Sequence, residues 1–203
     1  MDVNLFPRYL PWLKRPEYWY ASKIGNSEWT EEDVHQAIER QNIDFDPRRR
    51  ANPLGQYNGP SSLGELFGEY DLCKLNMLWT NFWREPRQLD QGWGFADMSE
   101  VNLVVAPSGR IEAYNAHPIS GMPGATDCLG ILAKDLESYL EALFYGQFNA
   151  IHFISGFPDE DPILFEKTVL VAKLCALIAG GYEYYDFWAG ILGLPPESAK
   201  SKS

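Results

Sequence analysis

His117 and Cys128 are the two residues that come nearest to a catalytic pair, because both lie in one loop rich in glycine and proline. A histidine can remove the proton of a cysteine thiol, and the thiolate that results is a strong nucleophile. A reactive cysteine also needs a cationic or helix-terminal environment, and the sequence places no third residue that would orient the histidine. We therefore expect ordinary loop residues here and assign no catalytic residue.

Metal ligands are the second kind of chemistry that the sequence could support. His35 and Glu39 are four residues apart on one predicted helix, and the acidic run Asp159–Asp161 follows His152. Zinc sites draw three or four ligands with a recognisable local spacing, and a calcium loop needs regularly spaced oxygen ligands and a glycine. Neither pattern is present, and no nucleotide-binding glycine motif occurs. We predict no metal and no cofactor.

The three cysteines, Cys73, Cys128 and Cys175, are odd in number and far apart, which argues against a disulfide framework. Cys175 lies in the most apolar run, residues 168–179, where we expect a buried thiol. That run is shorter than the about 20 apolar residues that span a bilayer, so it predicts a core helix and no membrane association. The first residues lack the pattern of a secretory signal, so we expect a cytoplasmic protein.

The charge of the chain limits its partners. The formal net charge is −11, from 17 basic and 28 acidic residues among 203. A field of this sign repels phosphate backbones, so we expect no direct binding to nucleic acid, and we expect Arg48–Arg50 to be solvated. The same field speeds encounter with a basic protein, although it can also serve solubility alone.

Two β-prone runs and several periodic runs predict the fold. A hairpin is expected over residues 101–114, around the turn Pro107–Gly109, with its first strand packed on both faces. Apolar residues at three- and four-residue steps predict an amphipathic helix over residues 132–144 and mainly helical structure over residues 62–83. A last helix is expected to end at Gly180. The class is α+β, with a central, mostly antiparallel sheet and flanking helices.

We divide the chain into three parts by composition. Residues 1–29 are rich in aromatic residues and prolines, and residues 1–90 are expected to form an N-terminal helical and aromatic region packed on the domain. Residues 91–194 are expected to form the α+β domain. Residues 195–203 are small, polar and proline-containing, so we expect a disordered tail.

From residue 95 to residue 193 the chain resembles two groups of immunity proteins. One is the SUKH superfamily, which shares a strand–turn–strand, a glycine-rich loop and a helix like residues 134–144. The other is the C-terminal domain of immunity proteins that protect against DNase effectors of type VI secretion. Its features appear here as the acidic loop 159–161, Leu164-Phe165-Glu166, Glu183-x-Tyr185-x-Phe187 and Gly190-Ile191-Leu192-Gly193. Trp188 stands where that group has a proline.

This resemblance implies a SUKH-like fold and a non-enzymatic protein that neutralises a cognate toxin, expected to be a basic nuclease effector. Two alternatives stay open. One is a regulatory scaffold of the same fold that binds a signalling or cell-wall protein, and the other is an unrecognised enzyme that uses His117, Cys128 or His152. The sequence does not indicate an oligomeric state. The expected contact surface is acidic and consists of Asp135, Glu137, Glu141, Asp159, Glu160 and Asp161.

Overall fold

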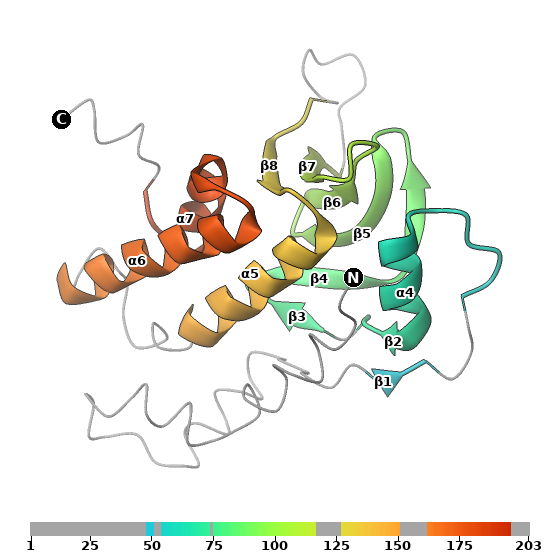
Figure 1. Cartoon of the computed structure of the whole chain (residues 1–203), viewed down its shortest axis with the longest axis horizontal. Helices are drawn as coiled ribbons and strands as arrows, with labels where there is room; N and C mark the ends of the chain where they lie inside the picture. The colour runs from blue at the N-terminus through green and yellow to red at the C-terminus, as the bar shows by residue number, and fades with distance from the viewer. Residues whose placement is uncertain (1–47, 51–53, 74, 117–126, 151–161, 196–203) are drawn as a thin grey trace.

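The computed structural model describes residues 48–50, 54–73, 75–116, 127–150 and 162–195 (Figure 1). The expectations for residues 1–47, for Asp159–Asp161 and for nearly all of the predicted tail lie outside these described residues. His117 and His152 lie outside them as well.

The main sheet has six strands, and each strand pairs in antiparallel fashion with the next strand of the chain. A separate two-stranded sheet joins β1 (Arg48–Arg49) to β2 (Tyr70–Asp71). The predicted α+β class with an antiparallel sheet is confirmed. The strands of the main sheet are β3 (Asn76–Met77), β4 (Thr80–Leu89), β5 (Gly92–Met98), β6 (Val101–Val105), β7 (Ile111–Asn115) and β8 (Gly130–Ala133).

The described helices are α4 (Ser61–Glu69), α5 (Leu136–Ala150), α6 (Pro162–Ala179), the 3-10 turn η2 (Tyr182–Tyr184) and α7 (Tyr185–Ile191). α4 contacts β4, α5 contacts β3 and β8, and α7 contacts β8. Figure 1 shows α5 crossing the sheet between α4 on one side and α6 with α7 on the other. In the described residues, no helix combines the length and the apolar character that crossing a bilayer would require.

The predicted hairpin is formed by β6 and β7. Val105 pairs with Ile111. Gly109 in the turn has φ +86°, and its N–H donates a hydrogen bond to the Ala106 carbonyl at 2.8 Å. Leu103 and Val104 point to opposite faces of the pleated sheet, and both are fully buried. The hairpin and the packing of its first strand on both faces are therefore confirmed.

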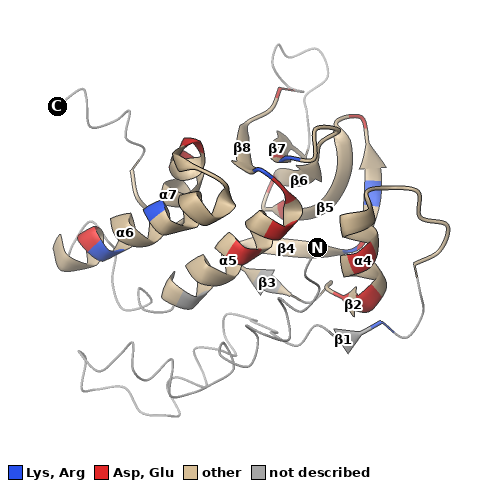
Figure 2. Cartoon of the chain, in the orientation of Figure 1, with Lys and Arg blue, Asp and Glu red and all other residues tan. Residues whose placement is uncertain are grey.

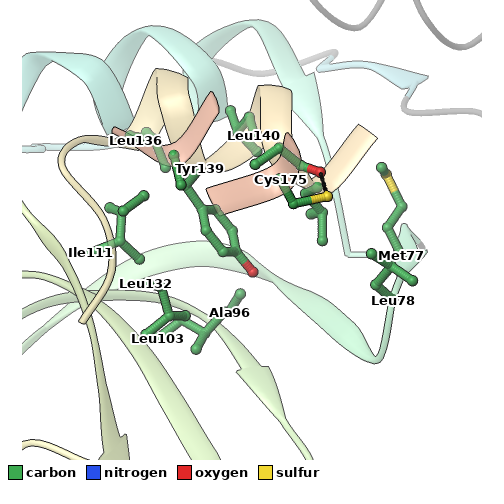
Figure 3. Close-up of a cluster of buried hydrophobic side chains, with 14 of the residues drawn as sticks. Met77, Leu78, Ala96, Leu103, Ile111, Leu132, Leu136, Tyr139, Leu140 and Cys175 are labelled. Atoms are coloured by element: carbon green, nitrogen blue, oxygen red, sulfur yellow. Dashed lines mark hydrogen bonds between the residues drawn. The ribbon is translucent and has the colours of Figure 1, made fainter. Parts of the chain in front are cut away.

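The predicted amphipathic helix is α5, which continues to Ala150. Its apolar residues fill the core, and Figure 3 shows Tyr139 reaching toward Leu103 and Leu132 of the sheet. The Tyr139 ring lies between Phe95 and Trp188, with ring centroids 6.0 and 5.9 Å away. These contacts fix α5 and α7 against one sheet face.

The prediction of mainly helical structure over residues 62–83 is wrong beyond Glu69. Tyr70 has extended backbone angles, φ −123° and ψ 142°, and begins β2. In β4, Thr80 and Phe82 are buried while Asn81 between them is exposed, which is the alternation of a strand. Leu78 lies in the turn before β4 at φ +45°. The apolar residues of this segment thus mimic helical spacing while they belong to strands and a turn.

The predicted boundary between residues 90 and 91 falls in the turn that joins β4 to β5. These two strands are paired over much of their length. Leu63 and Phe67 of α4 belong to the same buried core as Leu132 of β8. The described residues on the two sides of this boundary therefore share one sheet and one core.

Candidate partner-binding groove

One end of the sheet carries an open groove with a volume of about 710 Å³. In an antiparallel meander, alternate connections emerge at the same end. The β4–β5 turn, the β6–β7 turn and the link from β8 to α5 therefore meet here, next to the segment that leads into α4. We call this feature the end groove. Its lining residues include Pro60, Leu89, Asp90, Trp93, Pro107, Asp135 and Glu137.

Trp93 lines the end groove, and the ring of Tyr57 packs against it. The rings of Tyr57 and the half-buried Trp93 meet edge to face, with centroids 5.0 Å apart. The Tyr57 hydroxyl donates to the Pro60 carbonyl at 3.0 Å, and burial raises the pKa of Tyr57 to about 12. A Cβ at Gly59 would lie 2.7 Å from the Trp93 ring. A glycine is therefore needed where the 57–60 segment passes over the tryptophan.

Gly92, the first residue of β5, allows the β4–β5 hairpin to approach the β6–β7 hairpin beneath the end groove. It has φ +146°, and a Cβ there would lie 2.4 Å from the Val105 carbonyl oxygen. A side chain at this position would push β5 away from β6. The spacing of the walls thus depends on a backbone approach that only glycine permits.

The charged lining residues of the end groove that the structure describes are all carboxylates. Asp90 and Glu137 are exposed, and Asp135 is half-buried. The Asp135 carboxylate accepts a hydrogen bond from the Ser138 N–H at 2.8 Å, so it caps the N-terminus of α5. The positive end of the helix dipole also stabilises this charge. The groove therefore combines a fixed carboxylate with two exposed ones beside an indole ring.

Figure 2 shows acidic residues on the neighbouring helices α4 and α5. Glu141 lies one turn beyond Glu137 on α5, and it is half-buried and does not line the end groove. Glu65 is exposed and Glu69 is half-buried on α4, which contacts α5. Further carboxylates therefore lie on the helices next to the groove.

The structure thus brings together Asp135 and Glu137, two of the six residues predicted for the contact surface, in one groove. Asp159, Glu160 and Asp161 lie outside the described residues. Sequence reasoning missed Asp90 and Trp93. The segment Gly92-Trp93-Gly94 stands out in the sequence, but its role becomes visible only when the turns that surround it are assembled.

The cysteines that the sequence singled out have different environments. Cys175 is buried and its thiol lies 3.6 Å from the Ala142 carbonyl, and burial raises its pKa to about 12. Cys128 is exposed, with its sulfur 3.2 Å from the Gly130 carbonyl. The expectation of a buried thiol at Cys175 is confirmed. Among the residues described, no group of three or more His, Cys, Asp and Glu side chains could hold a metal ion.

The prediction that the arginines of residues 48–50 are solvated is wrong for Arg50. Its side chain is 10% exposed and forms an ion pair with Glu85 at 3.3 Å. Its backbone N–H donates to the Glu69 carbonyl at 3.0 Å, next to the β1–β2 pair. The arginine therefore ties the segment before α4 to β4.

The chain was compared with protein-family models, curated proteins and solved structures, and none of the three comparisons found a match.

Proposed function

We propose that this chain is a cytoplasmic, non-enzymatic immunity-type protein that binds a cognate toxin and occludes its active site. The observation that carries the proposal is the end groove, where Trp93 stands beside Asp90, Asp135 and Glu137. A lysine or arginine that enters the groove would meet carboxylate oxygens beside an indole ring, whose face attracts a cation. The groove therefore suits a basic segment of a protein partner.

The net charge of −11 supports the same class of partner. Nucleases carry basic residues in the cleft that grips the phosphate backbone, so an acidic protein is attracted to that cleft. Such attraction raises the association rate, while a buried aromatic anchor slows dissociation. The resemblance to immunity proteins against DNase effectors of type VI secretion favours a toxin of this kind.

The half-buried Trp93 is suited to act as the anchor. Aromatic residues held in a fixed orientation supply contact area with little loss of side-chain entropy on binding. Tyr57 and Gly59 hold the Trp93 ring in place before any partner arrives. Preorganisation of this kind strengthens binding because less freedom remains to be lost.

Titration of a candidate nuclease effector with the purified chain tests the proposal. An occluding protein inhibits stoichiometrically, so nuclease activity should fall linearly and vanish at one equivalent. The effector should remain covalently intact and regain activity when the complex is dissociated. Inactivation by far less than one equivalent would indicate an enzyme instead. Full activity in excess chain, for every effector that kills cells lacking this protein, would refute the immunity function.

A further inference from the structure

The outer face of α6 carries a row of exposed apolar side chains. Ile163, Leu170 and Leu177 are 66%, 58% and 59% exposed, and they follow one another at intervals of seven residues. This interval returns to nearly the same side of a helix, so the three residues form one line along α6. The opposite side is buried against α5 and α7 through Ala172, Cys175, Ala176 and Ala179.

The charges beside this row are arranged asymmetrically. Glu166 is exposed and Lys173 is half-buried, and helical periodicity places both on the same flank of Leu170, while the exposed Lys167 lies on the other flank. Glu166 lies four residues before Leu170, and Lys173 lies three residues after it. The flank therefore runs from negative to positive along the helix.

This pattern is self-complementary about Leu170. If two α6 helices lie antiparallel with a two-fold axis at Leu170, each Ile163 faces Leu177 of the second copy, because both lie seven residues from the axis. The same axis brings each Glu166 opposite Lys173 of the second copy, within about one residue rise of 1.5 Å along the helix. A two-fold axis makes every such contact twice.

We propose that a second copy of this chain covers the exposed face of α6 and forms an antiparallel, two-fold symmetric dimer. The apolar row supplies the contact area, and the two Glu166–Lys173 pairs fix the direction and the register of the helices. α6 contributes no lining residue to the end groove. The dimer therefore leaves that groove accessible and does not depend on the proposed function.

Sedimentation velocity of the full chain over a wide concentration range tests the dimer. The wild type should shift from monomer to dimer as concentration rises. Leu170→Asp places two carboxylates at the axis and should keep the chain monomeric at every concentration. Leu129→Asp is the matched control, since Leu129 is 52% exposed elsewhere on the surface, and it should dimerise like the wild type. Circular dichroism should show the same fold in all three proteins.

Charge exchange tests the register. Glu166→Lys and Lys173→Glu should each weaken the dimer about tenfold, and the double exchange should restore it, because both pairs are reformed with reversed sign. A wild type that stays monomeric would overturn the proposal and assign the face to another partner or to another part of the chain. A Leu170→Asp dimer as strong as the wild type, or a double exchange that restores nothing, would overturn it too.

Discussion

The hydroxyl groups of Thr80 and Tyr139 lie 2.9 Å apart in the core and link β4 to α5. Both residues are fully buried, and desolvation raises the pKa of Tyr139 well above its ordinary value. Each hydroxyl therefore supplies the hydrogen bond that offsets the desolvation cost of burying the other. This contact joins the start of β4 to the first turns of the helix whose N-terminus borders the end groove.

Tyr139→Phe should lower the free energy of unfolding by about 1–2 kcal/mol, because the Thr80 hydroxyl is left buried without its partner. Thr80→Val together with Tyr139→Phe should recover part of that loss, since both polar groups are then removed. Urea denaturation of the two single variants and the double variant measures the coupling. Strictly additive losses would show that the two hydroxyls do not stabilise each other.

Gly92→Ala should lower the free energy of unfolding by more than about 1 kcal/mol, because the added Cβ meets the Val105 carbonyl oxygen at a left-handed φ. Gly55→Ala is the matched control. Nothing lies within 4 Å of a Cβ there, so the change should be neutral or slightly stabilising. Thermal and urea denaturation of both variants provide the comparison. Equal effects at the two glycines would contradict the close approach of β5 to β6.

Local patterns predicted α5 and the β6–β7 hairpin because each has a period that one element explains. The apolar steps from Leu136 to Phe144 fit only a helix, and two β-prone runs surround the turn at Gly109. For the segment before β5, the same kind of pattern predicted a helix where strands and a turn are found. Leu75, Leu78 and Phe82 have helix-like spacing although they come from a loop, a turn and a strand. Their burial depends on contacts with distant parts of the chain, which local periodicity does not encode.

The turn between β3 and β4 should respond oppositely to two substitutions at Trp79. Leu78 and Trp79 have φ values of +45° and +66°, a left-handed pair that favours Asn and Gly. Leu78 is held by its N–H bond to Gln147 at 2.7 Å, whereas Trp79 is 70% exposed. Trp79→Asn should therefore stabilise the protein by up to about 1 kcal/mol, and Trp79→Val should destabilise it by about 1 kcal/mol.

The two variants at position 79 are compared by urea denaturation under identical conditions. A left-handed backbone disfavours a β-branched side chain more than an asparagine, so the order of stability is the critical result. If valine proves at least as stabilising as asparagine, the turn is not left-handed in solution.

Cys175 should make stability fall at alkaline pH. Burial raises the pKa of its thiol from 9.0 to about 12 in the folded chain. Above about pH 9 the unfolded chain loses a proton that the folded chain retains, so the free energy of unfolding falls until about pH 12. Below about pH 9 the thiol is protonated in both states, so its full contribution to the free energy of unfolding is present. Buried tyrosines act in the same direction, so Cys175→Ala should reduce the slope without abolishing it.

Chemical denaturation at several pH values between 8 and about 11 measures this slope. Equal slopes in wild type and Cys175→Ala would show that the Cys175 thiol is not shielded from water in the folded state.

The end groove could be foreseen only in part. Asp135 and Glu137 were predicted as contact residues from the acidic face of one helix. Asp90 and Trp93 lie more than forty residues earlier, and they reach the groove only because the meander returns its turns to one end of the sheet. No short-range pattern links these positions. The capping role of Asp135 had a local signal in the aspartate itself, which directly precedes the periodic apolar run of α5.

Binding through the end groove is tested by the dissociation constant of the purified complex with the effector that the chain neutralises, measured for wild type, Asp90→Lys and Glu137→Lys. Glu100→Lys is the control, since Glu100 is exposed in the β5–β6 turn at the opposite end of the sheet. Each groove variant should bind about tenfold more weakly, which corresponds to about 1.4 kcal/mol, and its affinity should depend less on salt. The control should change affinity by much less. Equal losses in all three variants, or groove variants that bind like the wild type, would contradict binding through the end groove.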